Sequence, residues 1–187
     1  KVWVTGASSG IGKAVAEKFA KEKWKVAISA RRVEILNEMA NNDIIFAYPM
    51  DVTNQNKTEE TFNKILEDFG DLDLCVFSSG TYERKSEKGL NVDNVKKVIE
   101  VNFLGVVGCV KAVQEYFQNK KGGHISIVSS PVGYRGLPKS SGYTASKASL
   151  NNFTQGIYFD FKKFNVRVTL ISPGFIKTAL TDKNDFK

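Results

Sequence analysis

Short apolar runs rich in β-branched residues alternate with amphipathic stretches along the chain, and this alternation constrains the fold more than any other feature. It predicts strands at Val2–Thr5, Val26–Ser29, Ile44–Tyr48, Leu74–Ser78, His124–Ser129 and Val166–Ile171, and helices at about Ile11–Lys23, Val33–Asn41, Lys57–Phe69, Val92–Gln118 and Gly142–Lys163. Strands that alternate with helices form a parallel sheet covered on both faces. We therefore expect one doubly wound α/β domain over residues 1–187, with its ligand beyond the carboxyl ends of the strands.

The composition argues against several classes of protein. Hydrophobic residues make up 42% and charged residues 25% of the chain, and the lysines behind its net charge of +7 alternate with acids along the expected helices. That pattern favours a solvated surface over nucleic-acid binding. Cys75 and Cys109 lie in apolar stretches without CxxC spacing, which indicates reduced thiols in a cytoplasmic protein. With His124 as the single histidine and no apolar run near the roughly 18 residues of a membrane span, we expect neither a metal site nor a membrane partner.

The first expected strand runs into the sequence TGASSGIGKA, which has glycines at Gly6, Gly10 and Gly12. Glycines between a strand and a helix permit a tight turn, close approach to a pyrophosphate and close packing of the helix, whose N-terminus attracts phosphate. A P-loop is the nearest rival. It fails because the glycine spacing is wrong and Ala14 stands where a magnesium-binding Ser or Thr is needed. The turn therefore predicts dinucleotide binding.

The end of the second expected strand indicates which dinucleotide binds. NAD-binding folds place an acid there to hold the ribose 2′-hydroxyl, but this chain reads SARR, with Arg31 and Arg32 after Ala30. Guanidinium groups suit a 2′-phosphate, so NADP is favoured. Asp51 follows the third strand and is placed to bind the adenine amino group, although N-capping of the next helix is an alternative role.

A polar residue interrupts an apolar stripe in the fourth expected helix. Asn102 follows Val98 and precedes Val106 by four positions each, so the three share one face. A buried amide without partners costs on the order of 1–3 kcal/mol. A core hydrogen-bond network and a water-holding or helix-distorting role at an active site are both open.

The pattern YxxxK occurs three times, at Tyr116–Lys120, Tyr143–Lys147 and Tyr158–Lys162. Tyr143 opens a helix 13 residues after Ser130, which stands at the ligand end of the fifth strand. The same count back from the other two tyrosines reaches a phenylalanine and an alanine, neither of which has a hydroxyl group. Of the three YxxxK pairs, only Tyr143–Lys147 therefore has the hydroxyl partner that favours a catalytic role.

Taken together, these residues resemble the short-chain dehydrogenase/reductase family. The resemblance covers the whole chain and rests on TGxxxGxG at Thr5–Gly12, Asp51-Val52, Asn102, Ser130, YxxxK at Tyr143–Lys147 and SPGFIKT at Ser172–Thr178. It implies a Rossmann-like fold and an NADP-dependent oxidoreductase that acts on a small-molecule carbonyl or secondary alcohol. A non-catalytic NADP-binding regulator of the same fold is the alternative.

The resemblance also implies a catalytic tetrad. Tyr143 would be the acid/base, Ser130 would bind the substrate oxygen, Lys147 would hold the nicotinamide ribose, and Asn102 would anchor a proton-relaying water. Base strength at neutral pH requires the pKa of Tyr143 to fall by roughly 2–3 units from about 10. One ammonium about 4 Å away would supply about that much, so we expect a lowered pKa.

The implied cofactor contacts are Gly6, Ser8, Ser9, Gly10, Ile11, Gly12, Arg31, Arg32, Asp51, Val52, Ser78, Ser79, Gly80, Tyr143, Lys147, Pro173, Gly174, Ile176 and Thr178. The chain reads FSSG where the family has NNAG after its fourth strand, so contacts at this edge would come from serine or backbone. The family continues through a substrate-covering segment and a final strand. We therefore expect the encoded protein to continue past Lys187, and to form a homodimer or homotetramer through its two long helices.

Overall fold

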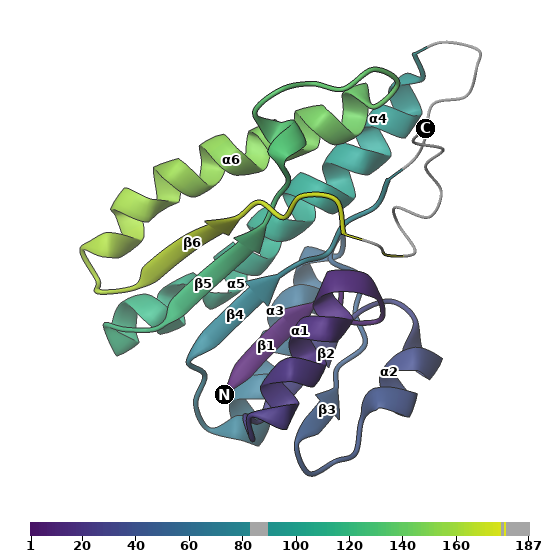
Figure 1. The fold of residues 1–187 in the computed structure, drawn as a ribbon. Helices are drawn as coiled ribbons and strands as arrows, with labels where there is room; N and C mark the ends of the chain where they lie inside the picture. Colours follow the sequence, from purple (N-terminus) through teal and green to yellow (C-terminus); the bar gives the residue numbers. More distant parts are fainter. Residues whose placement is uncertain (83–89, 177, 179–187) are drawn as a thin grey trace.

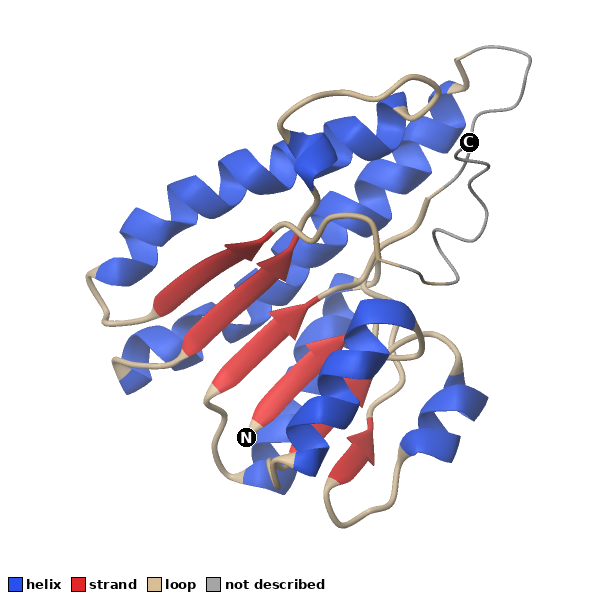
Figure 2. Cartoon of the chain, in the orientation of Figure 1, coloured by secondary structure: helices blue, strands red, loops and turns tan. Residues whose placement is uncertain are grey.

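The computed structural model describes residues 1–82, 90–176 and 178. The strands are β1 (Val2–Thr5), β2 (Val26–Ser29), β3 (Ile45–Ala47), β4 (Leu74–Phe77), β5 (His124–Val128) and β6 (Arg167–Ile171). The helices are α1 (Gly10–Lys21), α2 (Val33–Met39), α3 (Gln55–Phe69), α4 (Val92–Ile99), α5 (Gly105–Lys120) and α6 (Ser141–Lys162), with short turns η1 (Glu100–Leu104) and η2 (Pro131–Gly133). Helices and strands alternate as predicted (Figure 2).

Within the described residues, six strands form one parallel sheet in the order β3-β2-β1-β4-β5-β6 (Figure 1). The predicted doubly wound α/β fold is confirmed. The chain leaves β1 toward one edge of the sheet and later returns to place β4 on the other side of β1. The crevice for a ligand in such a fold lies at this reversal, beyond the carboxyl ends of the strands.

The core lies on both faces of the sheet, because the apolar residues of the central strand β1 point alternately to the two faces. All four residues of β1 are fully buried, as expected of a central parallel strand. Val2 and Val4 pack with residues of α1 and α2 on one face. Trp3 points to the other face, where α3, α5 and α6 contribute most of the core. Its indole Nε1 donates to Ser29 Oγ at 2.9 Å, which satisfies two polar groups in the interior.

One expected element is interrupted. The helix predicted at Val92–Gln118 consists of α4 and α5 joined by η1, a turn of π-helix that contains Asn102. A π-turn widens the helix by one residue and commonly marks functional positions. The apolar stripe that predicted one straight helix therefore continues across a local distortion.

The other boundaries differ from the predicted ones by one or two residues. Helix α3 begins at Gln55, before the expected Lys57, because Asn54 caps it by accepting a hydrogen bond from the Lys57 N–H at 3.0 Å. Cys75 and Cys109 are buried free thiols, as expected. Over residues 1–82, 90–176 and 178, none of the helices is both long and apolar enough to span a bilayer.

Candidate functional site

The glycine turn joins β1 to α1 and packs tightly against the end of β4. Gly6 has φ of +68°, a left-handed conformation that favours glycine. Gly12 is required for space, since a Cβ atom there would lie 2.5 Å from both Gly6 O and Ser78 Oγ. Ser78 in turn donates to Thr5 O at 2.7 Å. The serine of FSSG therefore anchors the turn, and the turn cannot accept larger residues.

The N-terminus of α1 is open to an anion. Its N-cap residue, Ser9, makes no side-chain capping hydrogen bond, and the first turn carries no acid. By contrast, Asn54 and Asn91 cap α3 and α4 with their side chains. Uncapped N–H groups and the positive end of the helix dipole attract phosphate. The local structure at α1 thus fits the phosphate-binding role expected of the glycine turn.

Two arginines lie at the end of β2, beside this turn. Arg32 donates to Ser8 Oγ through Nε at 3.1 Å and through Nη2 at 2.9 Å. Arg31 Nη1 lies 3.8 Å from Asp51 Oδ2, and the Arg31 side chain is 64% exposed. The two cations therefore flank the turn, one held by a serine and one free enough to reorient.

Asp51 does not cap α3, contrary to the alternative left open by the sequence. Its Oδ1 accepts hydrogen bonds from the N–H of Thr53 at 3.0 Å and from Thr53 Oγ1 at 2.9 Å. Asn54 provides the N-cap. Asp51 shapes the loop after β3, and its Oδ2 faces Arg31.

Asn102 is fully buried in the π-turn and connects three segments. Its Oδ1 accepts from the Thr81 N–H at 2.7 Å, and its Nδ2 donates to Thr81 O at 2.9 Å and to Ser146 Oγ at 3.1 Å. Ser146 donates to Tyr143 O at 2.7 Å. The distorted helix thereby holds the loop after β4 and the first turns of α6 in fixed relation. The amide thus has core hydrogen-bond partners and lies in a distorted helix, and its water-holding role at an active site stays a prediction.

The three YxxxK pairs have the same local geometry. The lysine Nζ lies 5.7 Å from the ring centre of Tyr143, 5.8 Å from that of Tyr116 and 5.6 Å from that of Tyr158. Spacing on a helix therefore gives each tyrosine an ammonium neighbour, and only the surroundings distinguish the copies.

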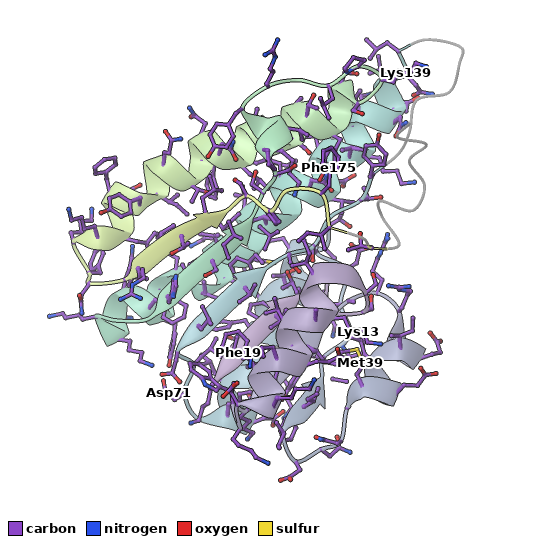
Figure 3. All side chains as sticks on the ribbon, viewed as in Figure 1. Lys13, Phe19, Met39, Asp71, Lys139 and Phe175 are labelled. Carbon is purple, nitrogen blue, oxygen red and sulfur yellow. The ribbon has the colours of Figure 1, made fainter. Side chains whose placement is uncertain are left out.

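Those surroundings differ sharply. Lys147 is 5% exposed and donates to Val128 O at 3.0 Å, at the carboxyl end of β5. Lys120 instead binds Asp71 at 2.7 Å, and Tyr116 donates to the same carboxylate. Figure 3 shows Asp71 at the amino ends of the strands, whereas Phe175 lies beyond the carboxyl end of β6. The Tyr158 pair is on the surface, where Tyr158 is 40% exposed.

Burial shifts the pKa of both residues of the Tyr143–Lys147 pair. The pKa of Lys147 falls from 10.5 to about 8 because burial disfavours the charged amine. The pKa of Tyr143 is raised above 10.0, first by burial, while a hydrogen bond with Ser130 lowers it and the nearby Tyr82 raises it. The expected fall in the pKa of Tyr143 is therefore wrong for the protein alone, because desolvation of the buried phenol outweighs the hydrogen bond with Ser130 that lowers the pKa.

One groove of about 400 Å³ runs between these features. Its lining combines Gly6, Ser8, Ser9, Gly10, Ile11, Gly12, Arg31, Arg32, Asp51, Val52, Ser78, Ser79, Gly80, Tyr143, Lys147 and Thr178, all named by the sequence, with Ala30, Met50, Val101, Val128 and Ser129. Asn102, Ser130, Pro173, Gly174 and Ile176 are not among the lining residues. Ile176 borders a separate apolar hollow along α1. Asn102 is connected to the site through Ser146, which donates to the backbone carbonyl of Tyr143. Ser130 is connected to it by a hydrogen bond with the Tyr143 side chain.

Sequence reasoning missed Thr81, Tyr82 and Ser146. Tyr82 packs its ring against that of Tyr143, with ring centres 5.1 Å apart. Thr81 and Tyr82 follow directly on the FSSG segment, so the rule that functional residues follow strand ends could have found them. Ser146 lies inside the YTASK segment, but the YxxxK pattern specifies only Tyr143 and Lys147.

The chain matches the family model described as short chain dehydrogenase over residues 1–186. Among similar sequences, an uncharacterized oxidoreductase of Staphylococcus aureus is 34% identical over 181 residues, which cover 95% of this chain and 78% of that protein. An uncharacterized oxidoreductase of Myxococcus xanthus is 35% identical over 188 residues, 98% of this chain and 74% of that one.

Two solved structures of oxidoreductases or NADP-binding proteins are also similar to this chain. ElxO with NADP bound superposes with a TM-score of 0.91 at 30% identity, and the match covers 97% of this chain and 76% of ElxO. An alcohol dehydrogenase from the archaeon Thermococcus sibiricus, complexed with 5-hydroxy-NADP, has a TM-score of 0.89 at 29% identity, covering 100% of this chain and 80% of that chain.

Proposed function

Because the chain belongs to the short-chain dehydrogenase family and is an oxidoreductase of small molecules, we propose that it transfers hydride between NADP and a carbonyl or secondary alcohol. One observation carries the proposal. A single groove joins the arginines and the glycine turn at one end to Tyr143 and Lys147 at the other. A dinucleotide bound across the carboxyl ends of β1 and β4 would bring its nicotinamide to these two residues.

The cofactor assignment rests on charge and on shape. Arg31 and Arg32 provide cations where NAD-binding folds place an acid, and the open N-terminus of α1 offers N–H groups to the phosphates. Gly80 lies beside the catalytic groups, since a Cβ atom there would be in van der Waals contact with Asn102 Oδ1 at 3.6 Å and Lys147 Nζ at 3.9 Å. Two structures similar to this chain hold NADP or its 5-hydroxy derivative. Of these features of the chain, the arginines favour NADP over NAD, because the pyrophosphate and the nicotinamide are common to both cofactors.

The residues around Tyr143 suit proton transfer. When bound, NADPH supplies the hydride. Tyr143 would donate its phenolic proton to the carbonyl oxygen, with which Ser130 would share a hydrogen bond. A raised pKa keeps this phenol protonated at neutral pH, which favours the reducing direction. Lys147, with a pKa of about 8, would remain mostly charged and would hold the nicotinamide ribose and draw the pKa of Tyr143 down.

A panel of aldehydes and ketones, scanned by consumption of NADPH, tests the proposal. Tyr143→Phe should fold, keep its affinity for NADPH and lose kcat by a factor of about 10² or more, as expected for loss of a general acid. The matched controls are Tyr116→Phe and Tyr158→Phe, which carry the same motif away from the groove and should change the rate little.

Equal losses in all three variants would attribute the effect to stability instead of chemistry. Full activity in Tyr143→Phe would remove the catalytic assignment. Tight NADPH binding without turnover on any carbonyl of the panel would favour a regulatory NADP-binding protein.

We further propose that the protein works in the cytoplasm as a homodimer or homotetramer, without a nucleic-acid or membrane partner. Large apolar side chains on the outer surface support self-association. Leu104 is 54% exposed in the π-turn, and Phe159 is 71% exposed on α6. In a monomer, these apolar side chains would remain exposed to water.

A further inference from the structure

A second tyrosine lies against Tyr143. The rings of Tyr82 and Tyr143 meet edge to face, with centres 5.1 Å apart and planes at 88°. This is the preferred geometry for an aromatic pair, in which the positive edge of one ring meets the negative face of the other. Tyr82 comes from the loop after β4, whereas Tyr143 stands in the first turn of α6. The contact therefore joins two elements at the catalytic end of the sheet.

Tyr82 is held at both of its ends. The backbone of Thr81, the preceding residue, is fixed by Asn102 through its N–H at 2.7 Å and through its carbonyl at 2.9 Å. At the other end, Tyr82 Oη lies 3.0 Å from Ser140 Oγ. Either hydroxyl can donate in this pair, and Ser140 also lies 3.4 Å from Pro138 O. A side chain anchored in this way can orient its neighbour.

Three groups face Tyr143 from three segments. Ser130, after β5, makes a hydrogen bond that lowers the pKa of the phenol. Lys147, on the same helix, has its Nζ 5.7 Å from the ring centre. Tyr82, after β4, closes a further side of the ring and raises the pKa. The backbone next to Tyr82 is held directly by the side chain of Asn102.

We propose that Tyr82 is a positioning residue for proton transfer, whose anchored ring orients Tyr143 and shields it from water. This inference rests on the proposed catalytic role of Tyr143. It also gives Asn102 a second route to the reacting group. One route runs through Ser146 to the backbone of Tyr143, and the other runs through Thr81 and the ring of Tyr82.

The ring and the hydroxyl of Tyr82 have separable effects. Loss of the ring exposes Tyr143 and removes a neighbouring phenol, and both changes lower the pKa of Tyr143. Tyr82→Phe also removes the phenol, and with it the hydrogen bond to Ser140, but it keeps the ring that covers Tyr143. Tyr82→Ala should therefore lower the pKa of Tyr143 clearly, and Tyr82→Phe should shift it less.

The first experiment needs no substrate. Protein labelled with ¹³Cζ-tyrosine is titrated by NMR, and the Tyr143 signal is assigned by its loss in Tyr143→Phe. The titration midpoint of Tyr143 should fall clearly in Tyr82→Ala and by less in Tyr82→Phe, which loses the phenol but keeps the cover of the ring. Tyr158→Ala is the matched control, since Tyr158 pairs edge to face with Phe159 on the outer part of α6, and it should leave the Tyr143 signal unchanged. If Tyr82→Ala does not fold, Tyr82→Gln, which is similar in length but polar, replaces it.

The second experiment uses any carbonyl of the panel that is turned over. Tyr82→Ala should lower kcat about tenfold, which corresponds to about 1.4 kcal/mol in the barrier, with the KM for NADPH unchanged. The rate of reduction should begin to fall at a lower pH, because the phenol of Tyr143 loses its proton earlier. Tyr82→Phe should restore most of the rate.

An unchanged midpoint for Tyr143 in Tyr82→Ala would overturn the inference, as would equal losses of rate in the alanine and phenylalanine variants. Failure of the proposed function would be seen as absence of turnover on the carbonyl panel, which neither of these results requires. A protein with no turnover on the panel would still show whether Tyr82 controls the phenol of Tyr143.

Discussion

Replacement of Lys147 by methionine should stabilise the protein at neutral pH while it abolishes activity. Lys147 is 5% exposed, and burial lowers its pKa from 10.5 to about 8. A difference of one in a pKa corresponds to about 1.4 kcal/mol, so the buried charge destabilises the folded state by about 3 kcal/mol. Methionine fills similar space without charge but leaves Val128 O without its donor, at a cost of about 1 kcal/mol. The net gain should be about 2 kcal/mol.

The pH dependence of stability gives a sharper test than the gain itself. The folded state binds the lysine proton less tightly than the unfolded state does. The penalty is therefore present in full below a pH of about 8, and it disappears as the pH rises toward about 10.5. Between a pH of about 8 and about 10, the free energy of unfolding of the unmodified protein should rise by about 2 kcal/mol relative to Lys147→Met.

Urea denaturation, followed by tryptophan fluorescence at several pH values, measures this difference. Burial raises the pKa of Cys75, Cys109 and Tyr48, and these groups weaken the folded state at high pH. They are present in both proteins, so their effect cancels in the comparison. Parallel stability curves for the two proteins over this range would refute the buried-charge argument, whatever the activity of the variant.

Two further predictions concern the cofactor and the glycine turn. NADPH should bind at least tenfold more tightly than NADH, a difference of about 1.4 kcal/mol, and Arg31→Ala should remove most of this preference; equal affinities in the unmodified protein, measured by calorimetry, would contradict the assignment. Gly12→Ala should lower the free energy of unfolding by about 1–3 kcal/mol, because its Cβ atom would lie 2.5 Å from Gly6 O. Gly156→Ala is its control, because no atom lies within 4 Å of a Cβ atom there; it should raise the free energy of unfolding by about 0.5–1 kcal/mol, and equal losses in the two variants would contradict the packing argument.

Much of the fold was readable from the sequence because its signals are local. An apolar β-branched run followed by a glycine turn and an amphipathic stretch identifies β1 and α1 within about 20 residues. The same alternation, repeated along the chain, predicts a parallel sheet. The cap of α3 is also local, since Asn54 binds a residue three positions later. Boundaries, which depend on such caps, varied by a few residues.

The distortion at Asn102 could not be predicted in the same way. The partners of its side chain, Thr81 and Ser146, lie 21 residues before it and 44 residues after it. An apolar stripe with a period of 3.6 residues is compatible with one straight helix and with two helices joined by a π-turn. Only the loop after β4 and helix α6, packed against this position, decide between them.

The sequence by itself determined that three tyrosines each have a lysine one turn later, and the structure gives all three pairs nearly one distance, from 5.6 to 5.8 Å. Tertiary structure decided what each pair does. It brings Asp71 to Tyr116 at the amino ends of the strands, and it places Tyr143 beside Tyr82 at the carboxyl ends. It also reversed the expected change in the pKa of Tyr143. Charge spacing along a helix is a local property, whereas desolvation depends on every segment that covers the phenol.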